Sequence, residues 1–251
     1  MKINNALIHG RRRFLQAAAA GGAGLAIGAL PAAARAAAEP SQKTKIGIIG
    51  SGRVGGTVGE LWVKAGHAVM FSSLDLEHDK ALAARLGAGA TAGTTREAAA
   101  FGDVLFIAVP YAALPQVGRD LGDAIKGKIV LDACNPIPAR DGDMAIEAKA
   151  KGTGLASPQF LPGARLVRAF NCVGYMSMKN EAHRAGERLG IPIAADDPEA
   201  LQRGARLVRD AGFEPVVVGG LARAKDFDYG TPIFGRPMTA AEVRRTLGIG
   251  T

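Results

Sequence analysis

Short apolar runs alternate with helix-like stretches along the chain from residue 45 onward. Eight of these runs have the length of a β-strand, and most are apolar throughout instead of alternating with polar residues. Continuous apolar strands are typical of a parallel sheet that is covered on both faces. The predicted strands are Lys45–Ile49, Ala68–Ser72, Ala90–Ala92, Val104–Pro110, Ile129–Asp132, Leu166–Phe170, a run that begins at Ile191, and Pro215–Val218.

The stretches between these strands favour helices. The predicted helices are Val54–Ala65, Asp79–Leu86, Arg96–Phe101, Ala113–Leu121, one that begins at Pro198, and Ala240–Leu247. Residues Ile137–Ser157 contain prolines and polar breaks, and we expect a loop there. The alternation predicts an α/β fold, a doubly wound, mainly parallel Rossmann sheet forming a single domain with an extra β-α-β unit. This domain would span residues 39–225. Residues 226–251 would form a C-terminal tail that lies on the domain or on a partner, and a homodimer is left open.

The first 38 residues have the pattern of an export signal. Arg11 and Arg12 precede Arg13, Phe14 and Leu15, which resembles the twin-arginine motif of the export machinery for folded proteins. An Ala/Gly run and small residues suited to signal cleavage follow. A membrane anchor is the alternative, but a spanning helix needs about 20 strongly apolar residues. The pattern therefore predicts a cleaved twin-arginine signal peptide over residues 1–38 and a periplasmic protein.

The positive charge of the chain belongs largely to this signal. The 251 residues contain 31 Lys and Arg against 23 Asp and Glu, a net charge of +8. Residues 1–38 contribute five of the basic residues and no acid, so about +3 remains without them. The composition therefore does not favour nucleic-acid binding. The two cysteines do not make a disulfide framework, and the histidines have no metal-ligand spacing. His67 is predicted to lie at the surface.

A glycine-rich turn joins the first predicted strand to the first predicted helix. Its residues are Gly50, Ser51, Gly52, Arg53, Val54 and Gly55. In this context Gly50 permits a tight turn, Gly52 lets the backbone approach a pyrophosphate, and Gly55 lets the helix pack closely on the strand. The free N–H groups and the dipole of the helix N-terminus favour phosphate groups. The turn predicts a dinucleotide site, and a glycine turn without a ligand is the alternative.

The end of the second predicted strand bears on the choice between NAD and NADP. An NAD site usually has an acidic residue here for the ribose diol, whereas an NADP site has hydroxyls and a cation for the 2′-phosphate. The chain has Ser72 and Ser73, followed by Leu74 and Asp75, and the next cation is Lys80. The hydroxyls favour NADP and the acids oppose it, so both cofactors are left open.

Taken together, these segments resemble the NADP-dependent reductases of the deazaflavin coenzyme F420. The same dinucleotide domain occurs in the cytosolic part of the six-transmembrane ferric reductases. The resemblance rests on IGIIGSGRVGGTVGELWVKAGHAVMFSS, VLFIAVPY, DACNP, LVRAFNCVGYMSM and the unit from IPIAADD to PVVVGG. It extends from Lys45 to about Phe227 and implies NADP held by the glycine loop and by a Ser-Arg pair after the second strand. Ser73 matches this serine, but Leu74 replaces the arginine.

The resemblance also implies roles at the ends of later strands, because ligands of parallel α/β sheets bind at the carboxyl edge. The residues from Val109 to Tyr111 would lie along the nicotinamide, and Asn171 and Cys172 would form the floor under the acceptor ring. The predicted cofactor-binding residues are Gly50, Ser51, Gly52, Arg53, Val54, Gly55, Ser72, Ser73, Val109, Pro110, Tyr111 and Asn135. The predicted acceptor residues are Tyr111, Asn171 and Cys172. Strand stops, a rim aromatic and loop caps are the alternatives for these positions.

The activity implied is hydride transfer between NADP(H) and a flavin-like or F420-type acceptor. The two ring cofactors would carry the chemistry, so no catalytic side chain and no metal are predicted. Two other functions are left open. One is an exported dinucleotide-binding protein without catalytic activity, and the other is an NAD(P)H-dependent ferric or flavin reductase.

Overall fold

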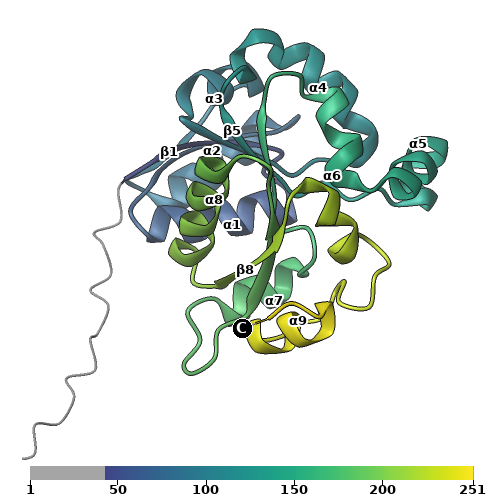
Figure 1. Cartoon of the computed structure of the whole chain (residues 1–251). Coiled ribbons are helices and arrows are strands. Elements are labelled where there is room, and N and C mark those ends of the chain that lie inside the picture. Colours follow the sequence, from purple (N-terminus) through teal and green to yellow (C-terminus); the bar gives the residue numbers. More distant parts are fainter. Residues whose placement is uncertain (1–42, 251) are drawn as a thin grey trace, which may run out of the picture. The chain divides into compact units, whose positions relative to one another are not determined.

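A computed structural model describes residues 43–250 of the chain (Figure 1). The predicted signal peptide, residues 1–38, lies outside the described residues. One sheet contains eight strands. They are β1 Lys45–Ile49, β2 Ala68–Ser72, β3 Ala90–Ala92, β4 Val104–Ile107, β5 Ile129–Asp132, β6 Arg165–Arg168, β7 Gly190–Ala194 and β8 Glu214–Gly219.

Helices connect and cover these strands. The α-helices are α1 Arg53–Lys64, α2 Leu76–Leu86, α3 Thr95–Phe101, α4 Leu114–Leu121, α5 Pro138–Lys151, α6 Thr153–Ala156, α7 Tyr175–Glu181, α8 Pro198–Asp210 and α9 Ala240–Leu247. Short 3-10 helices are η1 Tyr111–Ala113, η2 Gly122–Ile125, η3 Ser157–Phe160 and η4 Leu221–Phe227. Local sequence sets several helix starts. Thr94 and Thr239 each form a reciprocal capping box with the glutamate three residues later, and Asp197 caps α8.

The strand order is β3-β2-β1-β4-β5-β6-β7-β8. Strands β1 to β6 run parallel, and β1 pairs with β2 on one side and with β4 on the other. The strand order therefore reverses between β1 and β4, which is the switch point where open α/β sheets bind ligands. A single antiparallel pair, Arg168 with Ala194, joins β6 to β7, and β8 runs parallel to β7. The predicted doubly wound, mainly parallel fold with an extra β-α-β unit is confirmed.

Alternate strand residues point to opposite faces of the sheet, and each face has its own apolar core. On one face Trp62 of α1 packs edge-on against Phe106 and Phe170, with ring centroids 5.2 and 5.7 Å apart. The Trp62 Nε1–H donates to the Leu207 carbonyl of α8 at 2.8 Å, so α1 and α8 are joined on this face. Residues of α3, α4, α5 and α6 contribute to the core of the other face.

The last helix completes a third apolar cluster. Helix α9 packs on β7 and β8, with Val243 buried beside Phe227 and Ile233. This packing fixes the segment after β8 on the domain. Within residues 43–250, no helix combines the length and the apolar character needed to cross a bilayer.

Most predicted elements are observed within a few residues of their predicted limits, and the helix at Ala240–Leu247 is confirmed. Three strand and helix ends differ by two residues or more. The strand predicted to reach Pro110 ends at Ile107, the one predicted to reach Phe170 ends at Arg168, and α2 begins three residues before Asp79. In α2 the Asp75 carboxylate accepts the His78 backbone N–H, which starts the helix earlier.

Two predictions are wrong. The loop predicted at Ile137–Ser157 is helical, because it contains α5 and α6, with a break at Gly142 where φ is +60°. His67 is not a surface residue, since only 1% of it is exposed. Its Nδ1 accepts the Thr44 backbone N–H at 3.1 Å and its Nε2 lies 3.0 Å from Asp210 of α8.

Candidate functional site

The glycine loop lies at the switch point, between β1 and α1. Gly50 has a φ of +95°, which suits only glycine, and an added Cβ would lie 2.6 Å from the Ala108 carbonyl oxygen of the neighbouring segment. The N–H groups of Gly50 and Ser51 donate to the Ser72 carbonyl, at 2.8 and 3.1 Å. An added Cβ at Gly55 would lie 2.0 Å from the Gly50 carbonyl oxygen. Gly50 thus makes the turn, and Gly55 lets α1 approach the strand.

Gly52 has a different reason to be glycine. Its φ is −66°, which any residue adopts, and an added Cβ would meet no protein atom within 4 Å. Neither strain nor packing within the described protein requires glycine here. Gly52 also begins α1 without any side-chain cap, so the N–H groups of the first turn remain available. A ligand that approaches the backbone from the open side would explain both observations.

An open groove of about 540 Å³ extends from Gly52 across the switch point. It brings together five of the predicted cofactor residues, which come from the loops after β1, β2 and β4: Gly50, Gly52, Ser73, Val109 and Pro110. The lining is mainly apolar and includes Leu74, Ala113 and Val117. A second hollow of about 480 Å³ continues from Ser73 and Leu74 past Arg96 and Asp120. This arrangement suits an adenosine between apolar walls.

The two serines after β2 are placed differently. Ser72 is fully buried and its hydroxyl donates to the Ile48 carbonyl at 2.6 Å, so it does not face the groove. Ser73 lines the groove, and its hydroxyl donates to Asp79 of α2 at 2.9 Å. Ser51 also donates its hydroxyl to Asp79. Asp79 is fully buried, so one carboxylate joins the glycine loop to the end of β2. The sequence analysis did not single out this residue.

A basic hollow lies on the other side of the glycine loop, between α1, α2 and α7. Ser51, Gly52 and Arg53 line it together with Lys64, Arg85 and Lys179. Two of these cations are engaged with one carboxylate, because Glu60 pairs with Lys64 at 2.7 Å and with Arg85 at 3.0 Å. The Arg53 guanidinium lies 5.5 Å from the centre of the Tyr175 ring, in a cation-π contact.

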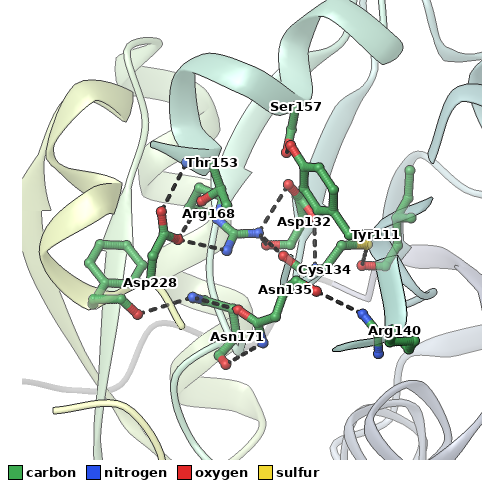
Figure 2. Close-up of polar contacts among 12 residues, drawn as sticks. Tyr111, Asp132, Cys134, Asn135, Arg140, Thr153, Ser157, Arg168, Asn171 and Asp228 are labelled. Atoms are coloured by element: carbon green, nitrogen blue, oxygen red, sulfur yellow. Dashed lines mark hydrogen bonds and ion pairs between the residues drawn. The ribbon is translucent and has the colours of Figure 1, made fainter. Parts of the chain in front are cut away.

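Two asparagines meet at the carboxyl edge beyond β5 and β6 (Figure 2). The Asn135 amide donates to the Asn171 backbone carbonyl at 2.8 Å, and the Asn171 amide donates to the Phe227 carbonyl at 3.2 Å. Phe170 has a φ of +62°, a left-handed conformation that turns the chain from β6 to Asn171. The Phe170 ring is held in the aromatic core, which offsets the cost of this conformation. Asn171 Oδ1 is buried and accepts no hydrogen bond from the described residues.

Tyr111 and Cys172 do not present their side chains to the groove. Tyr111 is fully buried, and the Ser157 hydroxyl lies 3.4 Å from its hydroxyl, so it is not a rim aromatic. Burial raises the pKa of Tyr111 to about 12. Cys172 is 3% exposed, and burial also raises the pKa of its thiol to about 12. A thiol with so high a pKa is a poor nucleophile at neutral pH, so Cys172 serves as a small buried residue.

A buried ion cluster lies next to these asparagines (Figure 2). Arg168, 1% exposed, lies 3.0 Å from Asp132 and 3.1 Å from Asp228. The Arg168 guanidinium also donates to the carbonyls of Asp132 and Cys134, at 3.0 and 2.9 Å. Thr153 donates its backbone N–H and its hydroxyl to Asp228. Burial lowers the pKa of Arg168, but the two carboxylates outweigh it and raise the pKa. The net effect keeps the guanidinium charged.

The part of the chain that forms this site is similar to known proteins. Residues 45–136 match the family model described as "NADP oxidoreductase coenzyme F420-dependent". This segment of the chain is similar to that family. The family segment contains β1 to β5, the glycine loop and both walls of the groove.

Individual proteins are similar to a longer part of the chain. An F420-dependent NADP reductase of Methanothermobacter thermautotrophicus is 27% identical over 75% of this chain and 87% of its own length. The metalloreductase STEAP3 of Rattus norvegicus is 28% identical over 75% of this chain, and the matched part is only 36% of that larger protein. The crystal structure of a hypothetical protein from Sinorhizobium meliloti superposes with a TM-score of 0.67 at 25% identity, covering 79% of this chain and 96% of that one.

Proposed function

We propose that this oxidoreductase transfers hydride between NADP(H) and a flavin-like acceptor of the deazaflavin F420 type. The observation that carries the dinucleotide part is Gly52, whose open side and uncapped helix start have no use within the described protein. A pyrophosphate on that side would accept from the N–H groups of Arg53 and Val54 and lie on the positive end of the α1 dipole. The family match supports NADP as the dinucleotide, and the F420-dependent relative supports the type of acceptor.

Different residues of the groove would hold different parts of the dinucleotide. The apolar lining residues Leu74 and Val117 suit the adenine, and the segment Val109–Pro110 would lie on the path toward the nicotinamide. The two asparagines beyond β5 and β6 suit the nicotinamide and the acceptor ring.

The chemistry of this reaction resides in the two ring cofactors when they are bound. The residues of this chain would align the rings and exclude water, which is the contribution that direct hydride transfer requires from a protein. The buried thiols and the buried Tyr111 phenol remain protonated at neutral pH and take no proton from the substrate. This agrees with a reaction that needs no general base.

The test uses Gly52→Val and Gly55→Val in the purified full chain. We expect Gly52→Val to fold with an unchanged Tm and to lose NADPH binding by calorimetry, because the side chain fills only the open side of the loop. Gly55→Val is the control for packing, since its Cβ would lie 2.0 Å from the Gly50 carbonyl oxygen and should lower the Tm. Unchanged NADPH affinity in Gly52→Val would mean that the loop is only a turn.

The acceptor is tested separately. The wild-type protein should catalyse the oxidation of NADPH when F420 is added as the hydride acceptor. The Gly52→Val variant should not. NADPH binding without oxidation by F420, FMN or FAD would favour the non-catalytic alternative and remove the acceptor from the proposal. The binding of NADPH and the transfer of hydride to the acceptor are thus tested separately.

We also propose that the chain is exported through the twin-arginine route to the periplasm. The support is the sequence around Arg11 and Arg12, since this route carries folded proteins and would allow the cofactor to be loaded beforehand. Replacing both arginines with lysine should retain the folded precursor in the cytoplasm, because lysine lacks the forked donors of arginine. Export of the double variant at the normal rate would exclude this route.

A further inference from the structure

The loop after β2 lacks the cation that a 2′-phosphate would need. Leu74 is fully exposed over the groove where a positive charge would be useful. The nearest cation in the sequence, Lys80, is engaged with Glu77 at 2.8 Å. Arg85 pairs with Glu60, and Arg53 lies over the Tyr175 ring in the basic hollow. None of these groups lines the hollow beside Ser73 and Leu74.

A different element supplies a cation at that place. Arg96 belongs to the first turn of α3, which follows β3, and lines the hollow together with Ser73, Leu74 and Thr94. Its guanidinium is exposed and forms no ion pair or hydrogen bond within residues 43–250. The neighbouring Glu97 does not neutralise it, because that carboxylate is engaged by the backbone and side chain of Thr94.

The other charges around the hollow make a cation necessary for any phosphate. Asp120 lines it from α4, and Asp75 lines the adjoining groove. Asp79 lies buried behind Ser73 and accepts the hydrogen bond of the Ser73 hydroxyl, which is then not available to donate to a ligand. A phosphomonoester beside three carboxylates, with its serine donor engaged, binds only if a positive group offsets the repulsion.

We propose that Arg96 forms a subsite for the 2′-phosphate of NADP and so determines the preference for NADP over NAD. This inference rests on the proposed function, since it presumes an adenosine in the groove between Leu74 and Val117. The guanidinium has the forked donors that phosphate recognition favours. The cation is thereby moved from the loop after β2, where the family pattern has it, to the helix after β3.

The experiment measures dissociation constants of NADP, NAD and 2′,5′-ADP by calorimetry for the wild type and for Arg96→Gln. We expect NADP and 2′,5′-ADP to bind about tenfold more weakly to the variant, with NAD unchanged, which corresponds to about 1.4 kcal/mol. Arg96→Lys should recover part of the loss. Arg244→Gln is the matched control. This substitution removes the same charge, but Arg244 lies on α9, away from the groove.

Each other outcome is decisive. Equal losses for NADP and NAD would assign Arg96 to the adenine or to the fold and overturn the phosphate subsite. Unchanged NADP affinity, or a wild type that prefers NAD, would overturn it as well. Binding of neither nucleotide to the wild type would instead refute the proposed function itself, so the two failures are distinguishable.

Discussion

Ser51 and Ser73 both donate their hydroxyl protons to the buried carboxylate of Asp79. The glycine loop and the end of β2 are therefore fastened to α2 by one acid. In dinucleotide-binding folds the glycine loop lies at the pyrophosphate and the end of the second strand lies at the adenosine ribose. A carboxylate behind them makes the outer surface of the site less favourable for a 2′-phosphate and leaves a 2′-hydroxyl unaffected.

Replacing this acid should shift the cofactor preference. Asp79→Asn removes the negative charge, retains the shape, and releases one serine hydroxyl for donation to the ligand. We expect the affinity for NADP to rise by about threefold to tenfold relative to NAD, since the loss of one nearby charge is worth about 1 kcal/mol. Calorimetry with both nucleotides measures the ratio. A fall in both affinities would mean that Asp79 serves chiefly to hold the glycine loop.

Adding a cation beside Ser73 should act in the same direction. Leu74 lines the groove and is fully exposed, so Leu74→Arg places a guanidinium there without disturbing the core. Charge-assisted hydrogen bonds contribute about 1.5–3 kcal/mol before solvent screening and repulsion from Asp75 are subtracted. We expect the NADP/NAD affinity ratio to rise roughly tenfold. The rise should be larger in an Arg96→Gln background, where the added arginine has no competitor for the phosphate. Equal rises in the two backgrounds would mean that residues 74 and 96 do not act on the same phosphate.

The buried ion cluster predicts a large stability effect. Arg168→Met leaves Asp132 and Asp228 buried without their cation, and such losses cost about 3–5 kcal/mol. Arg165→Met on the same strand is the control. Its pairs with Asp197 and Glu199 are partly exposed, so we expect a loss below about 1 kcal/mol. Urea unfolding of the two variants measures the free energy of unfolding. Equal losses would mean that the buried cluster contributes no more to stability than the exposed pairs of Arg165.

Asp141 predicts a pH dependence. Its carboxylate accepts the backbone N–H groups of Ile137 and Ala112 and pairs with Arg140. Burial raises the pKa of Asp141, but Arg140 and the two N–H groups outweigh it, so the pKa lies below the ordinary 3.8. A lowered pKa stabilises the fold above the ordinary value, and this stabilisation disappears as pH falls through the folded-state pKa.

The measurement compares wild type with Asp141→Asn. Their unfolding free energies should differ near pH 7 and converge as the pH falls below about 4. A difference that persists at low pH would come from lost packing instead of lost charge.

The sequence predicts the sheet well because its strands are continuous apolar runs and their glycine turns are local features. The segment Ile137–Ser157 misled the prediction, since the break at Gly142 and the prolines obscured α5, although Pro138 at the first helical position is a start signal. The burial of His67 could not be predicted, because its partner Asp210 is 143 residues away in the sequence.

The site shows the same division. The glycine loop, Ser73, Val109 and Pro110 converge as their positions after strand ends imply. Tyr111 follows a strand end too, yet η1 turns its side chain inward toward Ser157. Asp79 and Arg96 escape notice because their roles depend on how α2 and α3 pack beside the loop, which no local pattern encodes.

A single backbone pair joins β6 to β7, so the sheet has two halves, β3 to β6 and β7 to β8, with few backbone hydrogen bonds between them. At this junction β7, β8 and α8 are held to the rest by a shared apolar core and by three polar links, Arg168–Asp228, Arg165–Asp197 and Trp62–Leu207. Two of these three links are ionic, so cooperativity between the halves should weaken with acid or salt before either half melts. Amide exchange in β8 would then become faster than in β1, and the floor beneath Asn171 would be the first part of the site to loosen.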